Sequence, residues 1–358
     1  MNRSKISEFT ATPTMTIIEA MEKIDKNAKG VLFIVNADET LVGCITDGDI
    51  RRWLLKTGNL SSEIKNAMTS APKTLFIDEK SKAKSIMQAE NITAMPLLNK
   101  DKTIEEIVFL SGKKVSESDK NGSALEAVPV VIMAGGKGTR LYPYTKILPK
   151  PLIPIGETPI VERIIDCYVK YGVSQFYMTV NYKKEMIRSY FSDIISNYNI
   201  SYVEENKPLG TGGSIKLIKD TLDKPFFVTN CDTLILADYS DIYKYHMESG
   251  NAITIVSALK NVIVPYGVLQ AGKNGEVMSM EEKPKLSYFV NTGMYVINPE
   301  VVDLIPSNTF FHMTDLADAV MKQGDKVGMY PVSEDSFLDM GEFSEMKRME
   351  EKLNIAEN

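Results

Sequence analysis

The sequence predicts two unlike parts: a large C-terminal α/β domain with a doubly wound sheet, and a smaller N-terminal α+β part. Three observations predict this division. Apolar runs alternate with helical stretches after residue 128, one supersecondary pattern occurs twice before residue 112, and the segment between the two parts is polar. The length of 358 residues suits this plan, because domains commonly have about 150 residues.

The N-terminal part, residues 1–112, contains a weak internal repeat. From Thr16 the pattern gives a helix, the apolar strand VLFIV, a turn, the strand LVGCIT and a second helix, and from Ser81 the same order starts again. Each copy has too little apolar surface for its own core, so we expect the copies to pack on each other. Residues 113–127 are predicted to be a linker, since polar and charged residues dominate there without an apolar period.

This repeat resembles a pair of cystathionine-beta-synthase-type (CBS) domains. In ITDGDIRR, Thr46 and Asp49 fit the family's Ser/Thr-x-x-Asp signature, which implies an adenine nucleotide whose phosphate meets the hydroxyl and whose ribose meets the carboxylate. The second copy has Phe109 and Gly112 at these positions, so at most one cleft is intact. The alternative is that Asp49 only caps the following helix. The resemblance also implies regulation or assembly into a homo-oligomer.

The C-terminal part, residues 128–358, is predicted to be Rossmann-like. Its runs VPVVIMA, FYMTVN and FFVTNCD are nearly continuously apolar, as is typical of parallel strands buried on both faces. Helical stretches such as IVERIIDCYVKYG separate them. Because doubly wound sheets bind ligands at the carboxyl ends of their strands, we expect the chemistry directly after these runs.

A glycine-rich loop, AGGKGTRLYPYTKILPKPL, follows the first run. Its glycines allow backbone N–H groups to approach phosphates closely. The spacing is not that of a P-loop, and a dinucleotide fingerprint would need Gly at position 141, which is Leu, so a dinucleotide-dependent dehydrogenase is excluded. Arg140 and Lys150 bracket the loop and could neutralise a pyrophosphate leaving group. The alternative is an ordinary solvated basic loop.

The string GGKGTRLYPYTKILPKPL resembles the signature of sugar-1-phosphate nucleotidyltransferases, and later motifs agree in order. The resemblance implies that Arg140 and Lys150 are catalytic and that Mg²⁺ is held by Asp232, which ends FFVTNCD, and by Asp339 in FLDMGEFSEM. Phe337 stands where the family more often has Trp.

The same resemblance assigns the remaining contacts. The nucleotide would contact the glycine-rich loop and the segment ENKPLGTGGSI, through Ala134, Gly135, Gly136, Gly138, Thr139, Glu205, Pro208, Leu209, Gly210, Thr211 and Gly212. The sugar phosphate would contact Gly267, Glu282, Lys283, Asn291 and Thr292.

The implied reaction joins a nucleoside triphosphate and a sugar 1-phosphate to give a nucleotide sugar and pyrophosphate. PLGTGG resembles guanylyltransferases of mannose- or heptose-type sugars, and a CBS pair ahead of the domain resembles the glucosamine-1-phosphate guanylyltransferases of bacterial legionaminic acid synthesis. We therefore expect GTP and glucosamine 1-phosphate. Mannose or heptose 1-phosphate and uridylyl or cytidylyl transfer are alternatives. A hypothesis of another class is an adenine-nucleotide sensor with an inactive transferase domain.

Composition limits the other partners. Acidic residues outnumber basic ones by 47 to 41, a net charge of −6, which argues against nucleic-acid binding. No apolar run approaches the ~18 residues of a membrane span, and no signal-peptide core follows the N-terminus, so we expect a cytoplasmic protein. Cys44, Cys167 and Cys231 are far apart in the sequence, which predicts inert free thiols.

Overall fold

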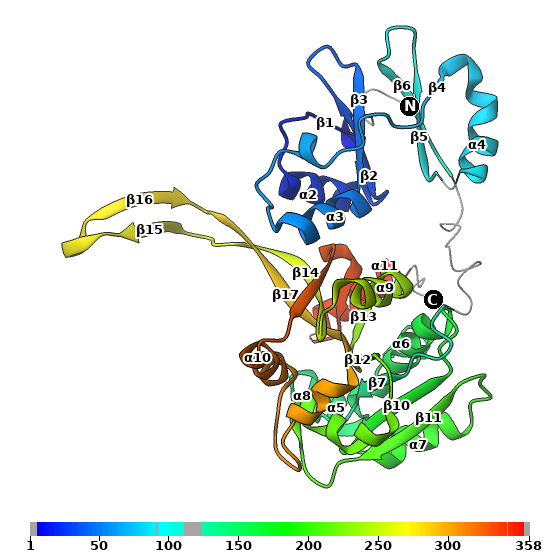
Figure 1. Cartoon of the computed structure of the whole chain (residues 1–358), viewed down its shortest axis with the longest axis vertical. Helices are drawn as coiled ribbons and strands as arrows, with labels where there is room; N and C mark the ends of the chain where they lie inside the picture. Colours follow the sequence, from blue (N-terminus) through cyan, green and yellow to red (C-terminus); the bar gives the residue numbers. More distant parts are fainter. Residues whose placement is uncertain (1–5, 91, 111–123, 342, 354–358) are drawn as a thin grey trace. The chain divides into compact units, whose positions relative to one another are not determined.

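The computed structural model describes residues 6–90, 92–110, 124–341 and 343–353, and the chain divides into two compact units, 1–121 and 122–358 (Figure 1). Most of the segment 113–127, expected to be a linker, lies outside the described residues. Its last part does not behave as a linker: Leu125 is buried in the core of the second unit, and its backbone N–H donates to the Tyr171 carbonyl at 2.9 Å. None of the described helices has the length and apolar character needed to cross a bilayer.

The first unit begins with a three-stranded sheet. Its strands are β1 (Thr10–Ala11), β2 (Val31–Val35) and β3 (Leu41–Thr46), in that order. Around them lie η1 (Ser7–Phe9), α2 (Ile17–Asn27), α3 (Asp47–Thr57) and η2 (Ile64–Asn66). The element order from Thr16 is the predicted one.

A second three-stranded sheet repeats this plan with β4 (Leu75–Phe76), η3 (Ile77–Lys82), α4 (Ala83–Ala89), β5 (Ala94–Leu98) and β6 (Ile104–Phe109). The expectation that the copies pack on each other is confirmed. One core cluster joins Phe9 and Phe33 of the first copy to Ala94 and Ile107 of the second. The position of Gly112 lies outside the described residues.

The second unit is built on a seven-stranded sheet with the order β11-β10-β7-β12-β17-β14-β18. The three predicted parallel strands are β7 (Val130–Met133), β10 (Gln175–Val180) and β12 (Phe226–Asn230), and β11 (Asn199–Glu204) extends the parallel set. The sheet is nevertheless mixed, because β17 (Lys285–Ile297) runs antiparallel to both β12 and β14 (Ile253–Ile263). The edge strand β18 (Val327–Val332) is parallel to β14.

Both faces of this sheet are buried. Within β7, Val130 and Ile132 face one core cluster while Val131 and Met133 face another, as the two-residue period of a strand requires. Helices α6 (Ile160–Val169), α7 (Lys184–Ser192), α9 (Tyr239–Ser249) and α11 (Phe343–Lys352) contribute to the first cluster. The second cluster contains residues of η7 (Ser214–Thr221), η9 (Pro299–Leu304) and α10 (Met313–Gln323).

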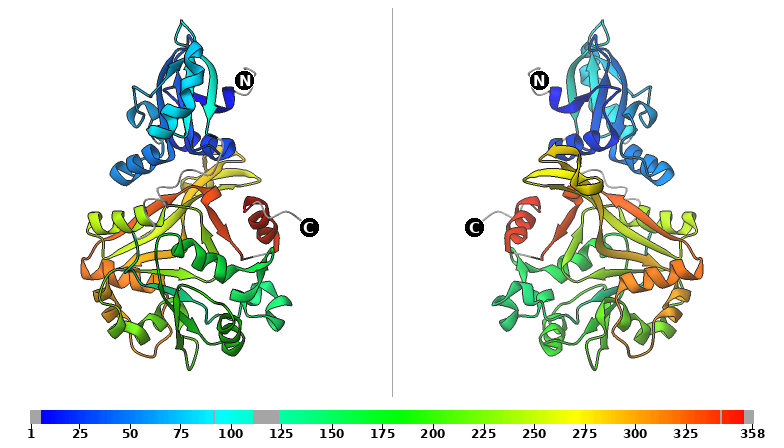
Figure 2. Two further views of the ribbon diagram at one scale, coloured as in Figure 1. Left: turned by 90° about the vertical axis from the view of Figure 1, so that its right-hand side faces the viewer. Right: turned by 90° about the vertical axis from the view of Figure 1, so that its left-hand side faces the viewer.

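Short elements connect this frame. They are η5 (Thr139–Leu141), α5 (Tyr144–Ile147), η6 (Lys150–Leu152), β8 (Pro154–Ile155), β9 (Thr158–Pro159), α8 (Gly210–Gly213), β13 (Thr233–Ile235), η8 (Lys273–Gly275), η10 (Glu334–Ser336) and β19 (Phe337–Asp339). Beyond the sheet, β14 and β17 continue as a two-stranded ribbon that leads into β15 (Gly267–Ala271) and β16 (Val277–Glu282). This ribbon is drawn in yellow in Figures 1 and 2.

The three cysteines are free thiols, as the sequence predicted. Burial raises the pKa of Cys44 to about 11 and that of Cys231 to about 12, and it raises the pKa of Cys167 in the same direction. Since the thiolate is the reactive form, these side chains are unreactive at neutral pH.

Candidate active site

Two acidic side chains that are far apart in the sequence are brought together by a short strand pair. Asp232 directly precedes β13, and the antiparallel pairing of β13 with β19 sets Thr233 opposite Asp339. The Met340 N–H donates to the Asp232 carbonyl at 2.9 Å and closes this pairing. Burial, reinforced by the negative charge of Asp232, raises the pKa of the Asp339 carboxyl. The two carboxylates therefore form one acidic site.

Lys150 supplies the positive charge beside this site. The side chain is buried, and its Nζ forms an ion pair with Asp232 Oδ2. Gly138 fixes the loop around it: this residue has φ +64°, and a Cβ there would lie 3.0 Å from the Lys150 Cβ and from the Thr145 methyl carbon. Thr145 Oγ1 also donates to the Gly138 carbonyl at 2.8 Å. Gly138 is thus required for packing, whatever its role toward a ligand.

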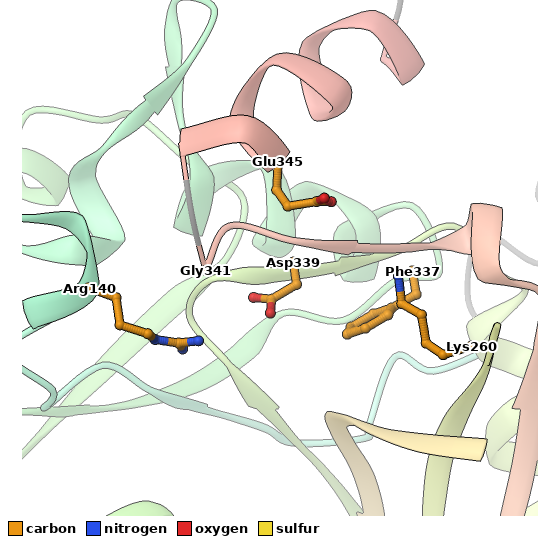
Figure 3. A pocket seen from close by; sticks show the side chains of 6 residues that line it. All are labelled: Arg140, Lys260, Phe337, Asp339, Gly341 and Glu345. Carbon is orange, nitrogen blue, oxygen red and sulfur yellow. The ribbon is translucent and has the colours of Figure 1, made fainter. Parts of the chain in front are cut away.

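Arg140 approaches the acidic site from the exposed side of the loop. A Cβ added to Gly341 would lie 3.1 Å from Arg140 Nη1 and 3.1 Å from Asp339 Oδ2, so both groups lie around the same glycine. In Figure 3 the Arg140 guanidinium and the Asp339 carboxylate point toward a common space. The structure therefore brings together all four residues expected to be catalytic or metal-binding.

A cavity of about 220 Å³ opens at this place, and it is lined by Arg140, Lys260, Phe337, Asp339, Gly341 and Glu345 (Figure 3). Sequence reasoning missed two of these residues. Lys260 comes from β14, where its Nζ pairs with Glu334 at 3.1 Å and lies 5.7 Å from the Phe337 ring centroid. Glu345 comes from α11. Lys260 lies in no motif. Glu345 lies in the motif FLDMGEFSEM that also contains Asp339, but no role was assigned to it, and only the fold places both side chains in the cavity.

Glu205 connects the two segments expected to bind the nucleotide. Its buried carboxylate accepts a hydrogen bond from the Leu209 N–H at 3.2 Å. On the other side, a Cβ at Gly135 would lie 2.7 Å from Glu205 Oε1. Burial raises the pKa of Glu205. The side chain is therefore placed to position the loop against the second segment, while Ala134 is anchored through its N–H to the Thr179 carbonyl at 3.0 Å.

The glycines of the second segment pack against the stretch that leads into α10, which contains Phe311. The N–H groups of Gly212 and Gly213 donate to the Phe311 carbonyl at 2.8 and 3.0 Å, and a Cβ at Gly210 would lie 2.6 Å from the same oxygen. Thr211 Oγ1 accepts the Met313 N–H at 3.1 Å and lies 3.4 Å from His312 Nδ1. His312 is thus a neighbour of the expected nucleotide-binding segment.

Three of the positions expected to contact the nucleotide lie at the surface of the second unit. Gly136, Thr139 and Pro208 are all exposed, and a Cβ at Gly136 would meet no atom within 4 Å. Space for a ligand is therefore available along this side of the loop.

The residues expected to contact the sugar phosphate fall into two groups. Asn291 and Thr292 lie where the register of β17 shifts against β14. Thr292 Oγ1 donates to the Val256 carbonyl at 2.8 Å, and Asn291 Nδ2 donates to the Tyr295 hydroxyl at 2.6 Å. The next residue is Gly293, with φ +83°. Only glycine fits at this position, because a Cβ there would lie 2.2 Å from Asn230 Nδ2 at the end of β12.

The other group, Gly267, Glu282 and Lys283, lies on the ribbon of β15 and β16. Gly267 pairs with Glu282, and all three residues are exposed. The structure does not bring them to the acidic site of the same chain.

In the first unit, Thr46 and Asp49 are joined by hydrogen bonds. The Asp49 N–H donates to Thr46 Oγ1 at 3.2 Å, and Asp49 Oδ2 accepts from the Thr46 N–H at 2.9 Å and from its hydroxyl at 2.7 Å. Asp49 Oδ1 pairs with Arg52 at 2.5 Å. This is a capping box for α3, which begins at Asp47: Thr46 is the N-cap and Asp49 is the third helical residue. Asp49 therefore contributes to the cap, but it is not itself the N-cap of a helix beginning at Ile50, as the alternative expected.

Asp232 and Asp339 form a donor set that suits Mg²⁺. In the part of the chain that the structure describes, no group of three His, Cys, Asp or Glu side chains could hold a metal by itself. Mg²⁺ is commonly bound by one or two carboxylates together with substrate phosphates, and two adjacent carboxylates beside a glycine-rich loop match that requirement.

The raised pKa of Asp339 gives a stability test. A carboxyl whose folded pKa is raised stabilises the fold at acid pH, and this contribution is lost as the pH rises through that pKa. We expect Asp339→Asn to raise the melting temperature of the metal-free protein at pH 7 and to have little effect below about pH 4, where Asp339 is already protonated. Scanning calorimetry across this range measures the difference.

Asp303→Asn is the control of opposite sign. Hydrogen bonds from Lys219 and Lys216 lower the pKa of Asp303, so its removal should not stabilise the protein at pH 7. A lower melting temperature for Asp339→Asn at pH 7 would contradict the electrostatic account of the site.

Comparison with known proteins places the second unit in a family. A model of the nucleotidyl transferase family matches residues 129–354, and a model of the CBS domain matches residues 3–56. Among solved structures, HddC from Yersinia pseudotuberculosis is 27% identical with a TM-score of 0.51, covering 63% of this chain and 99% of HddC. HddC has also been solved in complex with GMP-PN, with a TM-score of 0.50 and 26% identity.

Curated relatives give the same family. The UTP–glucose-1-phosphate uridylyltransferase of Synechocystis sp. is 33% identical over 232 residues, which cover 59% of each chain. The mannose-1-phosphate guanyltransferase of Saccharomyces cerevisiae is 35% identical over 184 residues, 49% of this chain and 51% of the relative. The chain thus spans about half the length of the curated relatives it matches. Because the family model covers more than half of the chain, the chain belongs to the nucleotidyl transferase family and carries a CBS domain ahead of the transferase domain.

Proposed function

We propose that the protein transfers a nucleotidyl group from a nucleoside triphosphate to a sugar 1-phosphate and releases pyrophosphate. One observation carries this proposal: Asp232, Asp339, Lys150 and Arg140 converge beside a glycine-rich loop whose Gly136 faces open space. Two carboxylates and two cations at the end of a phosphate-binding loop suit a reaction that moves negative charge between phosphate groups.

The chemistry is an in-line displacement. A phosphate oxygen of the sugar forms a bond to the α-phosphorus, while the bond between this phosphorus and the pyrophosphate oxygen breaks and its electron pair leaves with pyrophosphate. The attacking oxygen is already anionic, so the chain needs no general base. Arg140 stabilises the charge that develops on pyrophosphate, and Lys150 lies within reach of the triphosphate once its pairing with Asp232 is relaxed.

Mg²⁺ would be held by Asp232 and Asp339, and it supplies neutralisation of phosphate charge during transfer. Before substrates bind, the positive charge of Lys150 offsets part of the negative charge of Asp232 and Asp339. Lys150 thus offsets part of the cost of keeping both carboxylates ionised, and the remaining cost is seen in the raised pKa of Asp339.

For the base we propose guanine. PLGTGG resembles the guanylyltransferase form of this segment, HddC has been solved with GMP-PN, and the yeast relative is a guanyltransferase. UTP is the alternative substrate, because the relative from Synechocystis is a uridylyltransferase.

For the sugar we propose glucosamine 1-phosphate, for use in legionaminic acid or another surface glycan. Glu345 adds a carboxylate to the cavity wall, beside Asp339. The Glu345 carboxylate would complement the ammonium group on carbon 2 of glucosamine. Mannose and heptose carry a neutral hydroxyl at the same carbon. Mannose 1-phosphate and heptose 1-phosphate are the competing substrates.

Pyrophosphate release across a grid of nucleoside triphosphates and sugar 1-phosphates tests the reaction and both specificities. GTP with glucosamine 1-phosphate should react fastest, and Arg140→Ala should lower kcat by at least ~100-fold, the scale of one lost transition-state contact. A preference for UTP or CTP would contradict the guanine assignment. No release with any pair would contradict nucleotidyl transfer.

Glu345→Gln tests the sugar assignment. The variant should lose at least ~10-fold in kcat/KM for glucosamine 1-phosphate, because a charge-assisted hydrogen bond becomes a neutral one. Its kcat/KM for mannose 1-phosphate should stay within about twofold of the parent. Equal losses for both sugars would show that Glu345 does not read the amino group.

Two glycine variants separate ligand contact from packing. Gly136→Ala should leave the melting temperature unchanged and weaken GTP binding measured by titration calorimetry, because its Cβ meets only open space in the protein. Gly135→Ala should lower the melting temperature, because its Cβ would press on the buried Glu205 carboxylate. Normal GTP affinity in Gly136→Ala would contradict the proposed course of the triphosphate.

A further inference from the structure

The cavity beside Asp339 is lined by two cations, and the proposed reaction uses only one of them. Arg140 belongs to the glycine-rich loop, whereas Lys260 comes from β14. In Figure 3 the two side chains lie on opposite sides of the Asp339 carboxylate. Lys260 therefore marks the end of the cavity that lies away from the loop expected to bind the nucleotide.

Contacts on two sides hold the Lys260 side chain at this end. Its Nζ pairs with Glu334 Oε1 at 3.1 Å and lies 5.7 Å from the centroid of the buried Phe337 ring. Both members of the ion pair keep 29% of their side-chain surface exposed. The ammonium group is thus held in place and is still accessible to a ligand.

The pairing of β14 with β17 places an aromatic side chain beside Lys260. Lys260 is paired with Tyr288, and residues directly opposite each other in an antiparallel pair project on the same face. The preceding pair on this face is Ala258 with Val290, and both residues pack in the first core cluster. Lys260 and Tyr288, whose side chain is 54% exposed, continue this face beyond the end of the core.

The geometry of an in-line displacement indicates which substrate lies at this end. The attacking and leaving oxygens lie on opposite sides of the α-phosphorus. In the proposed function Arg140 stabilises the leaving pyrophosphate, so the sugar that carries the attacking phosphate extends to the opposite side, where Lys260 lies. An accessible ammonium group beside aromatic side chains is typical of a site for a small polar molecule.

The ion pair favours a neutral hydroxyl over a second anion as the group bound there. An ammonium group has three N–H donors and no acceptor. Glu334 already balances the positive charge of Lys260, so a phosphate or carboxylate on the sugar would have to compete with the Glu334 carboxylate. A hydroxyl can accept a hydrogen bond from another N–H of the same ammonium group without breaking the pair.

We propose that Lys260 donates a hydrogen bond to a hydroxyl on carbon 4 or carbon 6 of the sugar, on the side of the ring away from the phosphate on carbon 1. This inference rests on the proposed function and adds a residue that selects the sugar. Glu345 lines the same cavity and is assigned to carbon 2, so the two residues contact different substituents. A site built to hydrogen-bond a substrate hydroxyl discriminates against an analogue that lacks it.

Deoxy sugars test the assignment. Kinetics are measured with glucosamine 1-phosphate and with its 4-deoxy and 6-deoxy analogues, for the parent and for Lys260→Met, which keeps an apolar stem and removes the donors. For one analogue the parent should lose at least ~10-fold in kcat/KM, and in Lys260→Met this difference should shrink to within about twofold. A parent that does not discriminate, or a variant that discriminates as the parent does, would overturn the proposal.

Two further variants separate contact with the sugar from loss of the ion pair. Lys244→Met removes an exposed lysine of α9 that pairs with Glu248 at 3.9 Å, and it should keep the parent's discrimination between the sugars. Glu334→Gln removes the ion pair but leaves the ammonium group in the cavity, so it should also discriminate between them. If Glu334→Gln abolishes the discrimination as completely as Lys260→Met, the effect belongs to the ion pair and the proposal is overturned.

Binding without reaction separates failure of this inference from failure of the proposed function. Glucosamine 1-phosphate is titrated by calorimetry into the parent and into Lys260→Met, each in the presence of the α,β-methylene analogue of GTP, in which the bond that the reaction breaks cannot be cleaved. Lys260→Met should bind the sugar phosphate about 10-fold more weakly. Equal affinity of the two proteins, or no binding to the parent, would overturn the contact with the sugar.

Two other outcomes are equally decisive. Binding that depends on Lys260, without pyrophosphate release from GTP, would support the sugar contact and contradict the proposed reaction. Tighter binding of glucosamine 1,6-bisphosphate than of glucosamine 1-phosphate would show that Lys260 binds an anion, which would overturn the assignment of a hydroxyl.

Discussion

The candidate site depends on the pairing of β13 with β19, which holds Asp232 and Asp339 together. Two carboxylates that are partly removed from water repel each other, and the raised pKa of Asp339 reflects this cost. Lys150 offsets it through the ion pair with Asp232. The negative charge of the pair is therefore partly compensated within the chain itself.

The glycine-rich segments serve two physical purposes. Gly138 and Gly210 have left-handed φ angles and pack against Lys150 and Phe311, and Gly135 packs against Glu205. These close contacts fix the positions of the loop and of the segment 208–213 on either side of the expected nucleotide site. A Cβ at Gly136 would meet no atom within 4 Å, so the space beside it is available to a ligand. Rigid walls around open space are what a reaction driven by positioning and charge neutralisation requires.

Much of this arrangement could be predicted from the sequence, because its signals are local. Apolar runs identified β7, β10 and β12 as parallel strands, and the motifs identified Asp232, Asp339, Arg140 and Lys150. The antiparallel insertion of β17 could not be predicted, since strand direction depends on long-range pairing.

Some residues of the site could not be predicted for the same reason, namely that their position depends on long-range contacts. Lys260 and Phe311 lie in no motif, and Glu345 lies in the Asp339 motif without an assigned role. Only tertiary structure brings these residues to the cavity or to the glycines. Glu282 and Lys283 are expected at the sugar phosphate, but no local signal indicates that they lie on an exposed ribbon. For Thr46 and Asp49, one spacing suits both a nucleotide site and a capping box, and the hydrogen bonds of α3 display the cap.

The most direct test of the central claim is a crystal structure of the protein grown with GTP, a sugar 1-phosphate and Mn²⁺, in which anomalous scattering locates the metal. The account predicts an anomalous peak between Asp232 and Asp339, with the Lys150 ammonium turned from Asp232 to a phosphate oxygen. A nucleotide bound elsewhere, or a metal held away from these two carboxylates with the Lys150–Asp232 pair intact, would contradict it.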